Sequence, residues 1–183
     1  MLRSTLVSTT EELQQILQLQ KENHIRHIGE TDMQSQGFVT MRHTLGILQQ
    51  MHNLAPSVII KDSNKVVAYA LTMLRECRQL MRDLEPLFTL VDVLSWNNKL
   101  LTDYRFYVMG QICVAKEYRG RGLFDELYHH HKKIYQQQFD LFLTEISTRN
   151  QRSVRAHKRV GFKTICTHRD NLDEWDVVCW DWQ

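Results

Sequence analysis

Hydrophobic and polar residues follow two periods along the chain, and the alternation between them predicts strands separated by helices. Alternating or continuous apolar runs predict seven strands, at residues 2–8, 57–61, 65–76, 105–115, 139–146, 163–168 and 174–182. Apolar residues three or four positions apart predict helices at about 10–21, 41–53 and 150–162, and another directly after residue 122. The run 105–115 has no polar face, so we expect it to be a central strand.

Residues 77–101 separate two of the expected strands and carry apolar residues at helical spacing around Pro86. We interpret this segment as a helical insertion. The expected order is β-α-α-β-β-(α)-β-α-β-α-β-β, which contains two antiparallel hairpins and two strand–helix–strand crossovers. This order predicts a single α/β domain that spans residues 1–183.

The overall composition is that of an ordinary soluble globular protein. The 183 residues are 43% hydrophobic and 24% charged, which is enough to bury a sizeable core in one domain. The formal net charge is +2 and the charges are evenly spread. Such a balance gives no argument for binding to nucleic acid or to an anionic membrane surface.

The cysteine pattern and the first residues predict a cytoplasmic protein without a metal site. The four cysteines form no CxxC pair and no metal-ligand spacing; they are Cys77, Cys113, Cys166 and Cys179. The three consecutive histidines 129–131 splay by about 100° each on a helix, so they do not form a ligand cluster. The start MLRSTLVSTTEEL lacks an apolar core for a signal peptide, and no segment is long enough to span a membrane.

The stretch KEYRGRGLFDELYHH, residues 116–130, is the strongest chemical signal in the sequence. A glycine loop between a strand and a helix presents main-chain N–H groups at the positive end of the helix dipole, which favours an anion such as a pyrophosphate. Arg119 and Arg121 add charged donors. The loop lacks the P-loop motif, and Asp125 replaces the third glycine of a dinucleotide fingerprint. An ordinary tight turn before a helix is the alternative interpretation.

Two blocks in order along the chain resemble the GNAT superfamily of acetyl-CoA-dependent N-acyltransferases. The first resembles the pyrophosphate loop R/Q-x-x-G-x-G/A, with Arg119, Gly122 and Phe124 at its defined positions. The second resembles the N-x-x-S/A…GF helix, with Asn150, Ser153 and Gly161-Phe162. The resemblance covers roughly residues 57–182. Two positions depart from the pattern: Phe124 replaces a glycine or alanine, and His157 stands where the family often has a tyrosine acid.

The resemblance implies a twisted, mostly antiparallel sheet with a splayed central pair of parallel strands, 105–115 and 140–146, and helices on both faces. Acetyl-CoA would lie in the V between these strands as a co-substrate, and no metal is implied. Its pantetheine arm would pair with the main chain of Ile112, Cys113 and Val114 as an added strand. The remaining implied contacts are Asn150 and Ser153 for the arm, and Arg119, Gly120, Arg121, Gly122, Leu123 and Phe124 for the pyrophosphate.

The implied reaction is acetyl transfer to a primary amine of a small molecule, an amino acid or a peptide N-terminus. An alkylammonium with a pKa near ~10.4 needs a base before it attacks the thioester directly. Glu145 is the base candidate because a carboxylate within an apolar strand needs a task or a partner; a salt bridge is the alternative. His157 is the acid candidate, with a surface histidine as the alternative, and Tyr118 and Tyr107 are reserve acids. Cys113 is not expected to be a nucleophile, because no cation neighbours it in sequence.

Acceptor recognition is expected from the segments without motifs, 23–37, 77–101 and 170–174. Their candidate residues are His24, His27, Glu30, Asp32, Trp96, Asp170, Asp173 and Glu174, although acidic residues are more often solvated surface charges. The last strand, 174–182, could pair with a second copy and form a homodimer.

Two other functions remain open at this point. A non-catalytic acyl-CoA-binding module on the same fold would bind acetyl-CoA without turnover. Nucleic-acid binding by the helix 150–162 is a weaker hypothesis, because its basic residues circle the helix and no aromatic platform accompanies them. These residues are Arg149, Arg152, Arg155, Lys158 and Arg159.

Overall fold

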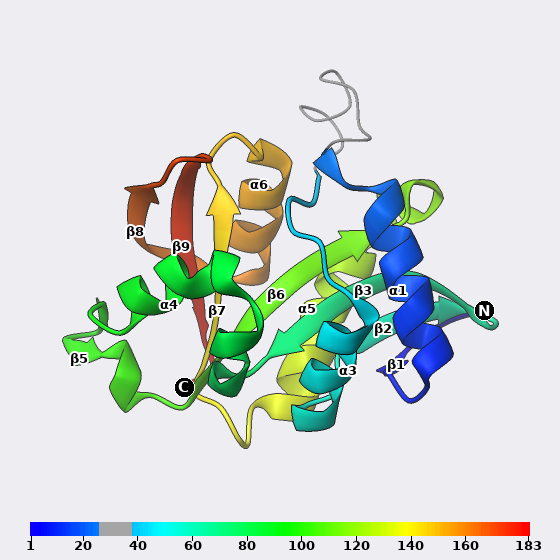
Figure 1. Ribbon diagram of the computed structural model, residues 1–183, viewed down its shortest axis with the longest axis horizontal. Coiled ribbons are helices and arrows are strands. Elements are labelled where there is room, and N and C mark those ends of the chain that lie inside the picture. The colour runs from blue at the N-terminus through cyan, green and yellow to red at the C-terminus, as the bar shows by residue number, and fades with distance from the viewer. Residues whose placement is uncertain (26–37) are drawn as a thin grey trace.

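The computed structural model describes residues 1–25 and 38–183, and its centre is one seven-stranded sheet (Figure 1). The strand order is β1-β2-β3-β6-β7-β9-β8, and every neighbouring pair is antiparallel except β6–β7. All seven expected strands are present, at β1 Leu2–Leu6, β2 Val58–Asp62, β3 Lys65–Met73, β6 Phe106–Val114, β7 Leu141–Ser147, β8 Lys163–Arg169 and β9 Glu174–Asp181. The predicted mixed α/β fold is therefore confirmed.

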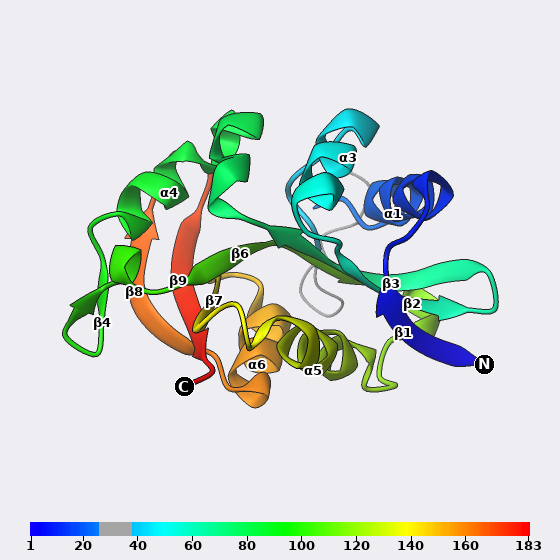
Figure 2. The same ribbon diagram turned by 90° about the horizontal axis from the view of Figure 1, so that it is seen from below.

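Helices cover both faces of the sheet, as predicted (Figure 2). One face carries α1 (Thr10–Glu22), α3 (Leu45–Leu54) and α4 (Glu85–Val91), whereas the other carries α5 (Leu123–Tyr135) and α6 (Gln151–Val160). The two faces have separate cores. The core under α1, α3 and α4 is largely aliphatic. The other face has a cluster of rings that includes Tyr107, Tyr128 and Phe142, and a smaller aliphatic cluster that includes Leu123 and Leu127 of α5.

Local sequence signals determine where the helices begin. Thr9 and Glu12 form a capping box at the start of α1, and the Asn150 side chain caps α6 by accepting the N–H of Ser153 at 3.2 Å. The helix expected at 41–53 begins instead at Leu45, because the hydroxyl of Thr44 accepts the N–H of Ile47 and caps the helix there.

The segment expected as a helical insertion is only partly helical. It contains two short 3-10 helices, Arg75–Leu80 and Arg82–Leu84, followed by the seven-residue α4. The prediction is wrong for residues 95–100, where β4 (Ser95–Trp96) and β5 (Lys99–Leu100) form a small hairpin. Asn97 and Asn98 both have positive φ, at 48° and 63°. Such a pair favours a two-residue hairpin turn over a continuing helix.

The central parallel pair is splayed, which confirms the shape that the family resemblance implied. The recorded β6–β7 pairing joins only Phe106–Val108 to Leu141–Leu143. Directly beyond it, β6 has two residues, Gly110 and Gln111, where β3 has one. Such a bulge bends a strand and increases its twist. The bulge therefore turns β6 away from β7 and opens the sheet between them.

One expectation about the sheet edges is wrong. The last strand, β9, does not lie at an edge: β7 pairs with one side of it and β8 with the other, so β8 is the edge strand. The suggested pairing of residues 174–182 with a second copy therefore has no unpaired edge to use. Among the described helices, none is long and apolar enough to cross a membrane.

Candidate active site

The opening of the sheet leads into a cleft of about 460 Å³ between the end of β6, the loop 116–122 and α6. All of the predicted cofactor-binding residues except Arg121 line this cleft, so tertiary structure brings the two sequence blocks together. The other lining residues are Asn23, Phe38, Val39, Tyr118, Asp125, Arg152, Arg155, Ala156 and Arg159.

The glycine loop has the backbone geometry of an anion site. Gly120 and Gly122 have φ angles of 75° and 78°, in the left-handed region that side chains rarely adopt. Gly122 is the N-cap of α5 and supplies no side chain to cap its first turn, whose N–H groups therefore remain available to a ligand. A Cβ at either glycine would meet nothing within 4 Å, so the space beside this backbone is open. These features fit a diphosphate at the positive end of α5.

The two loop arginines have different environments. Arg119 donates from Nε to the carbonyl oxygen of Val114 at 3.0 Å and from Nη2 to Oδ1 of Asn23 at 2.5 Å. It thereby ties the loop to the end of β6 and to the end of α1. The guanidinium of Arg121 lies over the ring of Tyr118, 5.2 Å from its centre, and does not line the cleft.

Three arginines of α6 supply positive charge to the lining of the cleft. Arg152, Arg155 and Arg159 all line it, and Arg159 is held by an ion pair of 2.6 Å between Nη2 and Oδ1 of Asp125. The sequence analysis missed this role and considered these residues only for nucleic acid. Their spacing of three and four residues places them on one side of a helix, and that spacing could have revealed the charged wall.

Glu145 lies on β7 and points to the face of the sheet that α4 covers. Side chains two apart on a strand share a face, and Leu141 and Leu143 pack in the core of that face. The Glu145 side chain is only 19% exposed, and the Nε2–H of His168 donates to its Oε2 at 3.2 Å. Burial raises the pKa of Glu145, and the hydrogen bond from His168 opposes that shift.

His157 does not lie at the cleft. Its Nδ1–H donates to the carbonyl oxygen of Ser153 at 2.8 Å, and its Nε2 therefore accepts from the hydroxyl of Tyr128, at 2.6 Å. The ring is 2% exposed, and burial lowers its pKa to about 4. His157 is thus a neutral core residue between α5 and α6. The geometry gives no support to its predicted role as the general acid.

The two departures from the family pattern contact each other. The ring of Phe124 packs edge-on against His157, with 5.0 Å between ring centres, and against Tyr128 at 5.1 Å. The bulky side chain at the last position of the loop therefore finds its space in the ring cluster between α5 and α6. The neighbouring ring is the neutral imidazole of His157, which accepts a hydrogen bond from Tyr128.

The reserve acids are also engaged. The hydroxyl of Tyr107 donates to Nδ1 of His131 at 3.0 Å in the buried ring cluster, away from the cleft. Tyr118 does line the cleft, and its hydroxyl donates to Oδ2 of Asp62 at 3.0 Å. That carboxylate raises the pKa of Tyr118.

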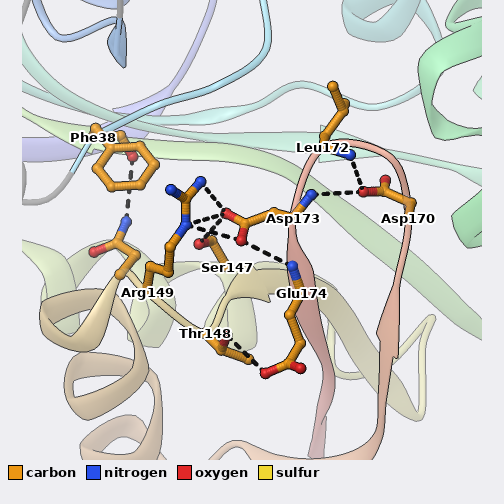
Figure 3. Close-up of polar contacts among 9 residues, drawn as sticks. Phe38, Ser147, Thr148, Arg149, Asp170, Leu172, Asp173 and Glu174 are labelled. Carbon is orange, nitrogen blue, oxygen red and sulfur yellow. Dashed lines mark hydrogen bonds and ion pairs between the residues drawn. The ribbon is translucent and has the colours of Figure 1, made fainter.

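The turn expected to recognise the acceptor is held by its own carboxylates (Figure 3). Asp170 accepts the main-chain N–H groups of Leu172 and Asp173, both at 2.8 Å. Asp173 accepts from the hydroxyl of Ser147 at 2.7 Å and from Nη2 of Arg149 at 2.8 Å. These contacts join the β8–β9 turn to the end of β7, and they already occupy oxygens of both carboxylates.

The other acceptor candidates are dispersed. Trp96 donates from Nε1 to Asp181 at 2.9 Å, and the Nε2–H of His24 donates to the carbonyl oxygen of Thr40 at 2.9 Å. Glu174 accepts from Nη2 of Arg169 at 3.0 Å. His27, Glu30 and Asp32 lie outside the described residues.

The sequence analysis missed a buried polar network beside the bulge in β6. The amide of Gln20 donates to Oε1 of Gln111 at 2.7 Å and to Nδ1 of His43 at 2.8 Å. The hydroxyl of Tyr69 also donates to Oε1 of Gln111. Burial lowers the pKa of His43 to about 4. Gln111 is a single polar residue in an apolar strand, and that signal could have identified it.

Comparison with known proteins now assigns the class of protein that this split sheet and cleft define. The sequence profile described as the acetyltransferase (GNAT) family matches residues 13–162. The chain therefore belongs to the GNAT acetyltransferase family. No curated protein sequence matches the chain.

Solved structures share the fold at low sequence identity. The ribosomal-protein-S18-alanine N-acetyltransferase from Escherichia coli is 12% identical, with a TM-score of 0.66, and the match covers 99% of this chain and 94% of that one. A chain of the NatC complex bound to Gag peptide and CoA is 12% identical, with a TM-score of 0.66 and 98% coverage of both chains. The acetyl-CoA-bound yncA from Salmonella typhimurium is 11% identical, with a TM-score of 0.64 and coverage of 100% and 94%.

Proposed function

We propose that this protein is an N-acetyltransferase that moves an acetyl group from acetyl-CoA to a primary amine. The observation that carries the proposal is the cleft, in which the open end of β6, the glycine loop and α6 meet. Membership of the GNAT family supports acetyl transfer as the chemistry.

Main-chain groups would bind most of the acetyl-CoA. The amides at the start of α5, beside Gly120 and Gly122, would hold the pyrophosphate, and the arginines of α6 would add charge. The carbonyl oxygen of Val114 already accepts from Arg119, so strand-like pairing with the pantetheine arm falls to Ile112 and Cys113. Asn150 would contact the arm, and its amide also fixes the start of α6 and donates to Phe38 at 3.4 Å.

Glu145 would act as the general base. Bound acetyl-CoA supplies a thioester, and an ammonium acceptor must lose a proton before its nitrogen can attack. A carboxylate whose pKa is raised by burial is better matched to this task at neutral pH than an exposed one. Because His157 is neutral and occupied, we assign no general acid to α6.

A peptide or protein N-terminus is the acceptor class to test first. Two structures that share the fold are described as acting on a ribosomal protein's alanine and as binding a Gag peptide. Small amines and free amino acids remain the other members of the proposed class.

The decisive experiment is a panel of peptide N-termini, amino acids and small amines incubated with acetyl-CoA, read by the release of CoA thiol. We expect turnover with at least one class, and mass spectrometry should show an acetyl group on the acceptor nitrogen. Tight acetyl-CoA binding without turnover across the panel would instead support the alternative, a non-catalytic acyl-CoA-binding module. Failure to bind acetyl-CoA at all would contradict both the proposed N-acetyltransferase and the non-catalytic acyl-CoA-binding module.

A further inference from the structure

Glu145 reaches its partner across an intervening strand. Both β7 and β8 pair with β9, so their backbones lie roughly 10 Å apart. Glu145 is opposite Val177 on β9, whereas His168 is opposite Trp175. The two side chains must therefore extend toward each other over β9 to bring Nε2 of His168 within 3.2 Å of Oε2 of Glu145. The contact therefore depends on the order and register of three strands and not on direct pairing of the two residues.

From this geometry, and resting on the proposed role of Glu145, we infer that His168 is a positioning residue of the reaction. Its Nε2–H holds one carboxylate oxygen of Glu145 in a fixed direction and stabilises the ionised form that accepts the proton. The other oxygen, Oε1, remains to take a proton from the acceptor's ammonium. In that step the N–H bond breaks, an O–H bond forms on Glu145, and the neutral amine keeps the electron pair with which it attacks.

The surroundings of the pair make this hydrogen bond important. Among the described residues, the titratable groups that act on Glu145 are His168 from β8 and Asp170 from the β8–β9 turn. Asp170 is an anion and raises the pKa of Glu145, as burial does. Of these two described groups, His168 acts in the opposite direction. Apolar residues of the same core share this face, among them Leu143 on β7, Val177 on β9 and Leu87 on α4.

The pair is also reachable from solvent. The side chain of His168 is 21% exposed and that of Glu145 is 19% exposed. They lie on the face of the sheet opposite to α5 and α6. An amine that approaches from this face would meet the carboxylate without passing the glycine loop.

The test compares His168→Leu with the wild type over pH 5 to 9, using an acceptor found in the panel. Leucine removes the N–H donor, so the pKa of Glu145 rises further and a smaller fraction is ionised at low pH. We expect the acid limb of the kcat/KM profile to move upward by about one unit, with the largest loss at the lowest pH and less than a twofold loss at pH 9. His129→Leu is the matched control, because His129 is an exposed histidine on α5.

Two further measurements separate this inference from a structural role. In a Glu145→Gln background, His168→Leu should leave the pH profile unchanged, because the residue acts through Glu145. The carboxyl resonance of Glu145, followed by carbon NMR in the absence of any acceptor, should titrate at higher pH in His168→Leu than in the wild type. An equal loss of activity at every pH, or an unchanged Glu145 titration, would overturn the inference. The NMR result stands even if no acceptor is acetylated, so the two proposals fail separately.

Discussion

The proposed cofactor side and the proposed acceptor side of the open sheet are built in different ways. The cofactor side would use main-chain atoms of one short stretch, the glycine loop and the first turn of α5, with charge from a neighbouring helix. The acceptor side would use side chains from separate strands, with Glu145 on β7 and His168 on β8. A site made of backbone is specified locally, whereas a site made of side chains depends on which strands become neighbours.

The same difference applies to the two departures from the family pattern. Phe124 keeps its N–H whatever its side chain, and its ring packs against Tyr128. At the position of His157, by contrast, the role that the family resemblance implies depends on the side chain itself. His157 accepts a hydrogen bond from Tyr128 and is buried, so it is no substitute for an acid that faces the cleft.

Gly122→Val is the strongest way to break the cofactor side. A β-branched residue at φ 78° is strained, and its side chain would enter the open space beside the first turn of α5. We expect acetyl-CoA affinity to fall at least about 100-fold, or ~3 kcal/mol, by isothermal titration calorimetry. Gly46→Val, in α3 and distant from the cleft, is the control. Wild-type affinity in a folded Gly122→Val protein would contradict the loop assignment.

Glu145→Gln tests the acceptor side without touching the cofactor side. We expect kcat to fall about 100-fold while acetyl-CoA affinity stays within twofold, because a general base contributes on this scale. The rate is measured by thiol release and the affinity by calorimetry. An unchanged rate would remove Glu145 as the base.

The same variant should be more stable than the wild type at neutral pH. Burial raises the pKa of Glu145, so its ionised form destabilises the folded state above that pKa. The penalty disappears as pH falls through the folded-state pKa. We therefore expect the melting temperature of Glu145→Gln to exceed that of the wild type by roughly 2 °C at pH 8 and by less at pH 4.5. A lower melting temperature at pH 8 would show that the pair stabilises the fold.

Buried histidines on both faces should make the protein sensitive to acid. Burial lowers the pKa of His43 and His157 to about 4 and that of His131 to about 3. Above pH ~6.5, the unfolded-state pKa, these histidines are neutral in both states and do not lower the free energy of unfolding. Below that pH the unfolded state takes up protons that the folded state does not, so the free energy of unfolding falls. At pH 5 each should cost about 2 kcal/mol of unfolding free energy. Urea unfolding at pH 7.5 and pH 5 measures this, and equal stability at both would refute the prediction.

Arg155→Gln should have the smallest effect on acetyl-CoA affinity, and it tests whether the arginines of α6 attract the cofactor by charge alone. Arg155 is exposed on α6 and lines the cleft, so its attraction for a phosphate is screened by water and salt. We expect acetyl-CoA to bind about threefold more weakly at low salt, and the difference to shrink at 0.5 M salt. Lys158→Gln, on the same helix but outside the cleft, should bind as the wild type does. A salt-independent effect would point to packing instead.

The sequence predicted the elements well and the contacts of the side chains poorly. Strands follow from short-range patterns of apolar and polar residues, and all seven appear close to where those patterns predict them. The prediction failed at the hairpin around Asn97-Asn98, where turn geometry outweighed an apolar spacing typical of a helix. Nothing in the sequence indicated that the guanidinium of Arg119 contacts Asn23, 96 residues away along the chain. The expected contact of Arg119 with a phosphate stays a prediction.

The sequence by itself therefore determined the strand–loop–helix unit that would bind an anion, because backbone angles at two glycines and the end of a helix are local properties. Only the tertiary structure decided that Glu145 has His168 as its partner and that His157 is turned into the core. The physical reason is that a side chain's partner depends on sheet order and on which helix covers which face, and neither can be read from neighbours in the chain.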